Sequence, residues 1–188
     1  MKKLLCFLVI AAIVVPVFAR KVIGINFDED YTVDGKKLVL NGVGLRMAEI
    51  ALGFKVNVYA GGLYLEKLSS DAQAIIASPQ TKLVRMIYAH SVDKEKSRKT
   101  WQENFEKNCA KCDSLKPILE TFKGMLEDMD EDQVQDFLFV GTKIKLTSKK
   151  KPKGEIDSAD FQKFLLSIWL DHAPNPELKD GMLGKAAK

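Results

Sequence analysis

The stretch from Asn41 to Glu66 constrains the fold most strongly, because it predicts a long strand with two different faces. From Phe54 to Gly61, apolar and polar residues alternate with the period of two that is typical of a half-buried strand. Gly42 and Gly44 predict a turn at the start of the stretch, because glycine tolerates left-handed or crowded backbone conformations. Between this turn and the strand we expect a short helix or turn over residues 45–52.

Arg46 and Tyr59 are the candidate binding pair of this stretch. An arginine presents five hydrogen-bond donors in a rigid fork, and a tyrosine adds a directional hydroxyl group. Together these two side chains are suited to hold a carboxylate or an enolate-like oxygen. The alternative is that Arg46 is a surface arginine and Tyr59 a half-buried strand tyrosine, since both residue types are common beside strands.

The N-terminus predicts export from the cytoplasm. Two lysines precede an apolar run from Leu4 to Val15, and the segment that follows, up to Ala19, is typical of a signal-peptidase site. The apolar run is shorter than the roughly 20 residues of a membrane-spanning helix. We therefore expect a signal peptide over residues 1–19, one domain over residues 20–188, and a periplasmic or secreted protein without a stable membrane anchor.

The charge of the chain is too small to indicate a nucleic-acid partner. The 188-residue chain has a formal net charge of +4, which falls to +2 when the two lysines of the signal peptide are removed. Phosphate binding needs a concentrated basic face. The one dense basic run, residues 149–153, and the acidic cluster over residues 128–132 are typical of solvated turns and loops, and the acidic cluster lacks the glycine and distal glutamate of a calcium loop.

The remaining elements predict an α+β domain. Strands joined by hairpins come first, and most of the helical patterns follow them, so we expect an antiparallel sheet with helices packed on one face. A cleft between such layers is where small apolar ligands are usually found. Strands are predicted over residues 21–27, 31–33, 37–40, 83–89, 137–140, 143–146 and 154–156, with a hairpin turn at Asp34-Gly35, a bulge or close approach at Gly61-Gly62, and helices that start near Asp71, Asp93, Pro117, Ser158 and Glu177.

Cys109 and Cys112 are separated by two residues, inside the helix that is predicted from Asp93. In an exported protein such a pair forms a disulfide, acts as a redox couple or contributes half of a metal site. The sequence has no second cysteine pair and its two histidines are not at ligand spacing, so we expect no metal site. Because redox couples usually lie at a helix N-terminus, the leading prediction is a structural disulfide or two packed thiols, with a redox role as the alternative.

Three segments make the sequence resemble the chalcone isomerase fold family, and most closely its bacterial exported chalcone-isomerase-like members. They are residues 40–46 together with 55–66, residues 101–109, and residues 164–184. These segments spread over nearly the whole mature chain in the order that the family has. The resemblance implies an open-faced β-sandwich, in which a long antiparallel sheet carries helices on one face and a ligand cleft lies between the two layers.

The catalytic pattern of the plant isomerases of this family survives only in part. Arg46 matches the arginine that lies close to the reacting oxygen, and Asn108 matches an asparagine of the same cleft. Tyr59 stands where the plant enzymes have a threonine, Trp101 stands where they have a tyrosine that serves the reaction, and Ser167 stands near another cleft hydroxyl. The indole of Trp101 offers no hydroxyl for a proton relay. The Arg46–Tyr59 pair instead resembles fatty-acid-binding relatives, in which an arginine and a tyrosine hold the carboxylate.

Three functions follow as hypotheses. The leading one is a non-catalytic protein that needs no cofactor and binds a small amphipathic ligand such as a fatty acid, with Arg46 and Tyr59 on the carboxylate and Trp101, Asn108 and Ser167 in the cleft. The alternative is an isomerase or lyase-type enzyme that acts on a chalcone-like enone through Arg46, Tyr59 and Asn108. The third is a structural or interaction protein whose cleft is filled by its own side chains.

Overall fold

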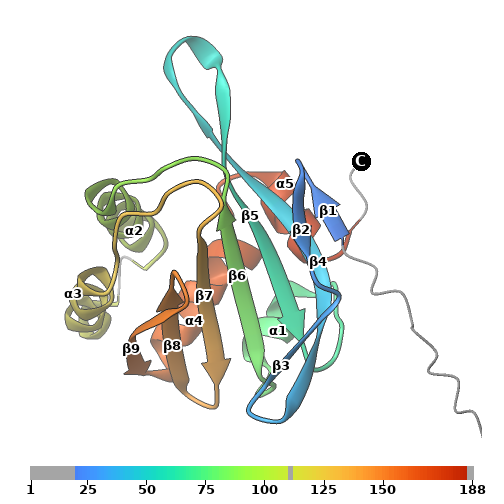
Figure 1. Ribbon diagram of the computed structural model, residues 1–188. Coiled ribbons are helices and arrows are strands. Elements are labelled where there is room, and N and C mark those ends of the chain that lie inside the picture. Colours follow the sequence, from blue (N-terminus) through green and yellow to red (C-terminus); the bar gives the residue numbers. More distant parts are fainter. Residues whose placement is uncertain (1–19, 110–111, 186–188) are drawn as a thin grey trace, which may run out of the picture.

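A curved sheet of seven antiparallel strands forms the centre of the protein (Figure 1). The computed structural model describes residues 20–109 and 112–185, so the signal peptide predicted over residues 1–19 lies outside the described residues. Each strand pairs with the next one along the chain. In sheet order the strands are β3 (Asp30–Val33), β4 (Lys36–Glu49), β5 (Lys55–Leu65), β6 (Lys82–Tyr88), β7 (Val134–Val140), β8 (Lys143–Ser148) and β9 (Lys151–Asp157).

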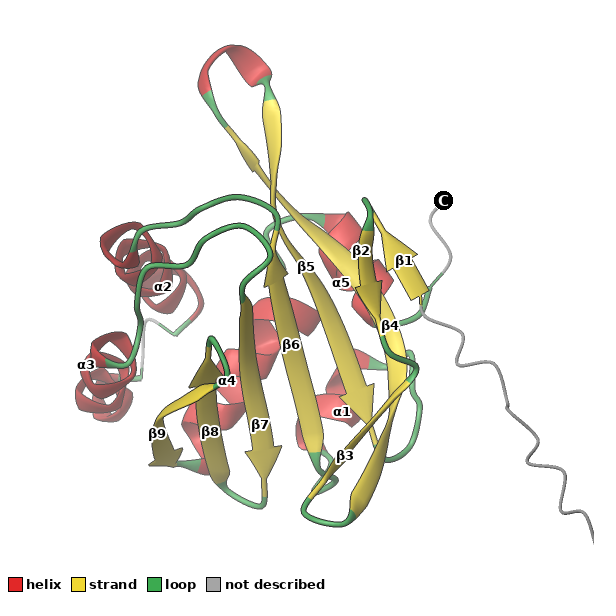
Figure 2. Ribbon diagram, viewed as in Figure 1, coloured by secondary structure: helices red, strands yellow, loops and turns green. Residues whose placement is uncertain are grey.

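The helices pack on one face of this sheet, as the sequence predicted. Figure 2 shows α1, α4 and α5 behind the sheet and α2 and α3 beside its β9 edge. Every one of these helices contributes side chains to a single core cluster with β5–β8. None of the described helices is long and apolar enough to span a membrane. The helices are α1 (Ala72–Ala77), α2 (Lys94–Asn108), α3 (Lys116–Gly124), α4 (Ala159–Leu170) and α5 (Pro176–Met182).

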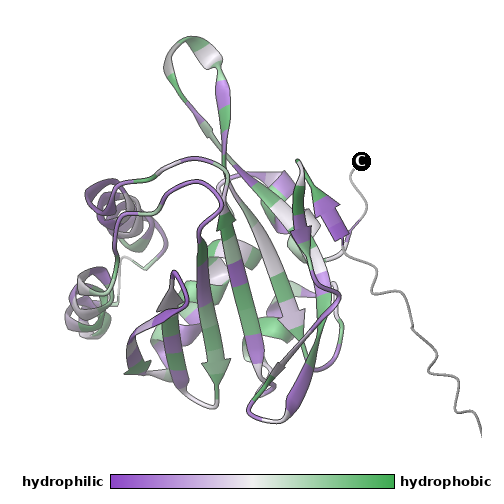
Figure 3. Cartoon of the chain, in the orientation of Figure 1, coloured by the Kyte–Doolittle hydropathy of each residue, from purple (hydrophilic) through white to green (hydrophobic). Residues whose placement is uncertain are grey.

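Local capping residues set where three of these helices begin. The side chains of Asp71, Asp93 and Ser158 each accept a hydrogen bond from a backbone N–H in the first turn of α1, α2 and α4. Alternating hydropathy likewise sets the strands, and Figure 3 shows hydrophobic and hydrophilic residues alternating along β7 and β8. The helix starts and the Asp34-Gly35 hairpin turn between β3 and β4 are therefore confirmed.

The N-terminal strand prediction is wrong in one respect, because residues 21–27 form a hairpin instead of a single strand. β1 (Arg20–Val22) and β2 (Ile25–Phe27) pair with each other, and the turn residues Ile23 and Gly24 both have positive φ angles. Phe27 is buried against the sheet face that the helices leave open, in a second core cluster with residues of β4, β5 and β6. The hairpin therefore covers part of that face.

The predicted turn at Gly42 and Gly44 and the predicted helix over residues 45–52 are also wrong. β4 runs on through both glycines to Glu49, and only Ala51–Gly53 forms a short 3-10 turn (η1). A Cβ atom on Gly42 or Gly44 would collide with backbone oxygens of α5. The two glycines therefore allow a helix to pack directly on the strand. Their role is to avoid a steric clash, and neither adopts the left-handed backbone conformation that glycine also permits.

Of the bulge or close approach predicted at Gly61-Gly62, the bulge lies elsewhere in the sheet, whereas the Phe27 ring packs so closely on Gly62 that a Cβ atom there would collide with it. Gly61 and Gly62 pair in register with β4, and the extra residues of the β4–β5 pair are Asn41 and Val58. The Asn41 side chain is buried, and it donates a hydrogen bond of 2.9 Å to the carbonyl oxygen of Met182. Near the other end of the sheet, β9 begins at Lys151 and is longer than predicted, while Lys149 and Lys150 form the turn that precedes it.

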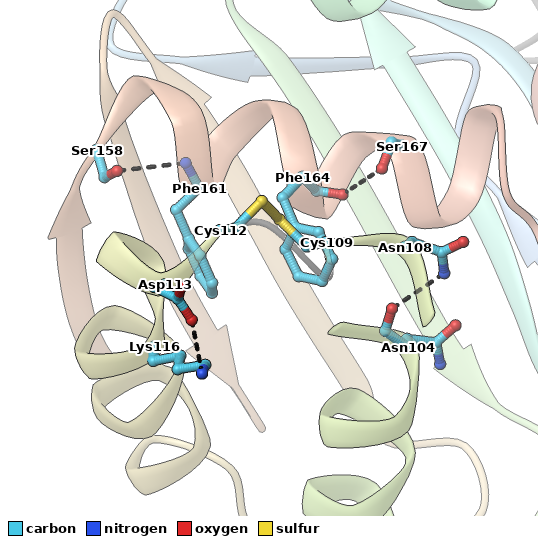
Figure 4. The surroundings of a disulfide bond; sticks show 10 residues. All are labelled: Asn104, Asn108, Cys109, Cys112, Asp113, Lys116, Ser158, Phe161, Phe164 and Ser167. Carbon is cyan, nitrogen blue, oxygen red and sulfur yellow. Dashed lines mark hydrogen bonds and ion pairs between the residues drawn. A yellow bond between two sulfur atoms is a disulfide. The ribbon is translucent and has the colours of Figure 1, made fainter. Parts of the chain in front are cut away.

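Cys109 and Cys112 form a disulfide, with their Cα atoms 5.2 Å apart (Figure 4). The sequence predicted that the pair lies inside a helix, and this prediction is wrong. α2 ends at Asn108, where Cys109 takes a non-helical backbone conformation, and Cys112 precedes the short 3-10 helix Asp113–Leu115 (η2) that leads into α3. Cys109 belongs to the core cluster on the helix side of the sheet, and Cys112 packs against it, so the bond joins the end of α2 to the start of η2 at the core.

Candidate ligand-binding site

A cavity of about 260 Å³ lies between the sheet and the helices α2 and α4. Its walls come from the upper parts of β4, β5 and β6 and from one face of each helix. Such a position between layers agrees with the cleft that the sequence predicted. The lining residues that matter below are Arg46, Ile50, Val58, Tyr59, Met86, Tyr88, Trp101, Asn104, Ile168 and Trp169.

Arg46 and Tyr59 form a directly opposed pair across the β4–β5 ladder, and both line the cavity. Opposed residues in antiparallel strands project from the same face of the sheet. The extra residue of β5, Val58, immediately precedes Tyr59, and a bulge of this kind re-aims the neighbouring side chain. The sheet therefore brings together the two residues that the sequence singled out.

The Arg46 guanidinium has no ion-pair or hydrogen-bond partner among the described residues. The side chain is half-buried, and this burial lowers the pKa of Arg46, while Tyr59 partly offsets the shift. An arginine remains protonated at neutral pH even after such a shift. A partly desolvated cation without a partner favours an anion that enters beside it.

The Tyr59 hydroxyl is held by an indole from α4. Trp169 Nε1 donates a hydrogen bond of 3.2 Å to Tyr59 Oη, so the tyrosine oxygen acts as an acceptor in this contact. The O–H proton of Tyr59 has no acceptor among the described residues. Burial raises the pKa of Tyr59 to about 12, against smaller effects of Trp169 and Arg46, so the group is a neutral donor at physiological pH. Arg46 and Tyr59 thus both present donors, and no carboxylate among the described residues pairs with either of them.

Tyr88 lines the same cavity, but its hydroxyl is already used. Its O–H donates 3.1 Å to Gln135 Oε1, and Gln135 Nε2 donates 3.0 Å to Ser148 Oγ, inside the sheet. The Tyr88 and Tyr59 rings lie with their centroids 6.0 Å apart. Tyr88 therefore contributes ring surface to the cavity wall, whereas Tyr59 contributes a hydrogen-bond donor.

Trp101 lies in the cavity wall, as predicted, and its ring is fixed by aromatic neighbours. It packs edge-to-face on Phe122 with centroids 5.1 Å apart and on Trp169 with centroids 5.6 Å apart. Such edge-to-face pairs hold a ring in one orientation. Trp101 therefore forms a rigid apolar wall on the side of α2.

Asn108 and Ser167, also expected in the cleft, do not line the cavity. The Asn108 amide donates 3.0 Å to the carbonyl oxygen of Asn104, and the Ser167 hydroxyl donates 2.7 Å to the carbonyl oxygen of Phe164 (Figure 4). Both side chains satisfy carbonyl groups of their own helices. The structure therefore does not bring these two residues together with Arg46 and Tyr59.

Several lining residues were not identified from the sequence. Asn104 lines the cavity one helical turn before Asn108, together with Ser97 and Thr100 from the same face of α2. The steps of three and four residues from Ser97 to Thr100 and from Thr100 to Asn104 are the signal that could identify this face. Tyr88 and His90, at the end of β6, gave no comparable signal because they share no periodic pattern with α2.

Comparison with known proteins agrees with this architecture. The family model described as chalcone isomerase-like matches residues 19–184. Among solved structures, the Arabidopsis thaliana fatty-acid binding protein AtFAP1 superposes with a TM-score of 0.71 at 14% sequence identity, over 86% of this chain and 92% of that chain. No curated protein matches the sequence. Because the family match covers most of its length, this chain belongs to the chalcone isomerase-like family.

Proposed function

We propose that this protein binds a fatty acid or a similar amphipathic carboxylate without catalysis, with the carboxylate between Arg46 and Tyr59. The observation that carries the proposal is that both groups line one cavity as donors, while no carboxylate of the described residues pairs with the guanidinium. The solved relative with the same fold is a fatty-acid binding protein, which supports this class of ligand.

The head-group chemistry suits a carboxylate because a carboxylate only accepts hydrogen bonds. The Arg46 fork provides charge-assisted donors, which are roughly twice as strong as neutral ones. The Tyr59 O–H adds a second direction of donation, and the Trp169 indole restrains the orientation of the phenol. A phenol whose orientation is fixed before binding reduces the ordering that the ligand must impose.

The tail chemistry suits an acyl chain. Val58, Met86, Ile168 and the aromatic rings form apolar walls, and burial of each methylene contributes about 0.8 kcal/mol. The cavity volume of about 260 Å³ is at the small end of ligand pockets. We therefore expect the cavity to enclose the carboxyl end and the first part of the chain, with a longer tail leaving past Ile50 at the rim.

The enzymatic alternative has less support. Asn108 is hydrogen-bonded within its helix outside the cavity, and the indole of Trp101 has no hydroxyl to relay a proton. The raised pKa of Tyr59 keeps its phenol neutral, so it serves poorly as a general base at neutral pH. An isomerase needs a positioned proton relay in addition to a donor for the oxyanion.

We also propose that the mature protein is exported, beginning after Ala19. The family match begins at residue 19, at the end of the predicted signal peptide, and the disulfide suits an oxidising compartment. Intact-protein mass spectrometry of material recovered from the cell envelope and medium is expected to show the mass that lacks residues 1–19. A mature mass that includes Met1 contradicts the export proposal.

Ligand binding is tested by native mass spectrometry of the purified protein, followed by calorimetric titration with dodecanoate and hexadecanoate. Wild type is compared with Arg46→Ala and with Arg98→Ala, an arginine deletion outside the cavity lining, where Arg98 pairs with Glu95 and donates to the carbonyl oxygen of Lys123 in α3. We expect Arg46→Ala to weaken binding by about 10–100-fold, the range for a lost charged hydrogen bond. Arg98→Ala is expected to bind like wild type.

Equal affinities of wild type and Arg46→Ala contradict the proposed head-group site. Turnover of a chalcone by wild type that is lost in Arg46→Ala favours the enzymatic alternative instead. A chain-length series sharpens the result, because the affinity gain per methylene is expected to level off once the enclosed part of the cavity is full.

A further inference from the structure

The large exposed hydrophobic side chains of the described residues gather at one end of the molecule. Ile50, Leu52 and Phe54 are 50%, 94% and 66% exposed and lie at the tip of the β4–β5 hairpin. Ile23 is 48% exposed in the β1–β2 turn. Only Leu68, 60% exposed, lies beyond the other end of β5. Scattered exposed hydrophobic residues are ordinary, but a group of them marks a contact with a partner or a membrane.

The β4–β5 hairpin projects well beyond the sheet (Figures 1 and 2). At its tip Leu52 has φ 62° and ψ 25°, a left-handed conformation that is uncommon for a leucine. Glycine or asparagine usually occupies such a position in a solvated turn. No burial within the chain explains the leucine, because its side chain is 94% exposed. A leucine there indicates a contact outside the molecule.

Ile23 belongs to the same surface as the hairpin. Ile23 and Gly24 line a surface groove together with Lys55, Val56 and Asn57, the first residues of β5 after the hairpin tip. Figure 1 shows the β1–β2 turn at the same end of the molecule as the projecting hairpin. We call Ile50, Leu52, Phe54 and Ile23 the apolar tip.

The apolar tip is continuous with the entrance of the ligand cavity. Ala48, Glu49 and Ile50 line the cavity from the hairpin, and Arg46 lies farther back along the same strand. Ile50 therefore belongs both to the cavity rim and to the exposed tip. A ligand tail that leaves the cavity past Ile50 emerges next to Leu52 and Phe54.

We propose that the apolar tip inserts reversibly into the surface of a lipid bilayer, so that an amphipathic carboxylate moves between the bilayer and the cavity. The proposal rests on the function proposed above. A fatty acid free of the protein resides in a bilayer with its tail among the acyl chains, and the tip places the cavity rim at that boundary. The backbone at the tip suits insertion, because the Ile50 N–H donates 2.7 Å to the Phe54 carbonyl oxygen.

A bilayer fits the tip better than a protein partner or a second copy of the chain. A stable protein interface buries about 800 Å² on each partner. A narrow loop with three apolar side chains is too small for that, whereas it can enter between lipid head groups. Glu49 opposes Lys55 in the last strand pair before the tip, so the opposite charges balance there. The contact is therefore expected to be mainly apolar and only weakly dependent on salt.

The test is co-sedimentation of the mature protein with phosphatidylcholine vesicles. The tip variant carries Leu52→Asp and Phe54→Asp, and the matched control carries Leu68→Asp at the opposite end. We expect wild type and the control to bind vesicles alike and the tip variant to lose at least about tenfold in partitioning. Wild type that stays in solution, or a tip variant that binds as well as wild type, overturns the proposal. A tip-dependent dimer in lipid-free analytical ultracentrifugation also overturns it, in favour of a second copy.

Two readouts separate this proposal from the proposed function. In vesicle-free titration with octanoate, whose short tail does not extend to the tip, the tip variant is expected to keep the wild-type affinity, because neither Leu52 nor Phe54 lines the cavity. Arg46→Ala is expected to bind vesicles like wild type but to lose fatty-acid affinity. Loss of vesicle binding in the tip variant, with fatty-acid affinity unchanged by Arg46→Ala, supports membrane docking and rejects the head-group site.

Discussion

Arg46 and Arg85 lie half-buried on opposite faces of the same sheet, and they differ in the partners that surround them. Arg85 makes two hydrogen bonds to Asp136, of 2.8 and 2.9 Å, and its guanidinium lies 4.6 Å above the centre of the Tyr31 ring. Burial acts to lower its pKa, but Asp136 more than offsets this, and the pKa is raised. Arg46 has no such partner among the described residues, and burial lowers its pKa.

This difference separates a structural arginine from a binding one. The guanidinium of Arg85 is satisfied within the fold, so it contributes to stability and has little left for a ligand. The guanidinium of Arg46 is held in a half-buried position that disfavours its charge, and an entering anion relieves that cost. Both residues are arginines on long strands, so the difference lies in what the neighbouring strand presents.

The largest effect on stability is expected for Arg85→Ala. Each side chain of the Arg85–Asp136 pair is only 17% exposed, and removal of one partner leaves the other charge without compensation. We expect a loss of about 3 kcal/mol in the free energy of unfolding, measured by urea denaturation, with little change in fatty-acid affinity. The double variant Arg85→Ala/Asp136→Ala is expected to lose less than the two single variants added together. Additive losses contradict the pairing.

The corresponding change on the other face, Arg46→Ala, is expected to have the opposite profile. Fatty-acid affinity is expected to fall by about 10–100-fold. The free energy of unfolding, measured by urea denaturation, is expected to change by less than about 0.5 kcal/mol, because no ion pair of the described residues is broken. Titration and denaturation of the same preparation give both values. If Arg46→Ala destabilises the fold as much as Arg85→Ala, the distinction between the two arginines fails.

Tyr59→Phe is expected to give a smaller, mixed effect. Loss of the hydroxyl removes one donor to the ligand and leaves Trp169 Nε1 without its acceptor. We expect affinity to fall by up to about tenfold and stability to fall by about 1 kcal/mol, the net value of one hydrogen bond. Tyr88→Phe, in which the lost hydroxyl is bonded to Gln135 away from the ligand, serves as the control and is expected to keep full affinity.

The last effect, a pH dependence of stability, is confined to alkaline pH. Burial raises the pKa of Tyr59 from its ordinary value of 10.0 to about 12, so the folded state favours the neutral phenol. This stabilisation is complete below pH 10 and is lost as the pH rises from about 10 through about 12. Over that pH range, the free energy of unfolding measured by urea denaturation is expected to fall less steeply for Tyr59→Phe than for wild type. Burial also raises the pKa of Tyr64, to about 12, and the pKa of Tyr88, so the test is the difference in slope between wild type and Tyr59→Phe, and identical slopes contradict the prediction.

Much of the architecture follows from local sequence. The alternation along β7 and β8 and the capping residues Asp71, Asp93 and Ser158 predict elements where they occur, because strand period and helix capping depend on neighbouring residues. Resemblance to the chalcone isomerase fold family predicted the layered fold. It also singled out the pair of residues that the sheet places side by side in the cavity wall.

Tertiary structure alone decided how the site is completed. The Tyr59 oxygen accepts a hydrogen bond from the indole of Trp169, 110 residues away in the sequence. Gly42 and Gly44 are needed because the backbone of α5 packs against them. Asn108 sits on the expected helix, but its amide turns back to the carbonyl oxygen of Asn104. Spacing along a chain shows which residues can share a face. Which partner each polar group finds depends on packing between distant segments, and it is this packing that left Arg46 facing a cavity and Arg85 paired.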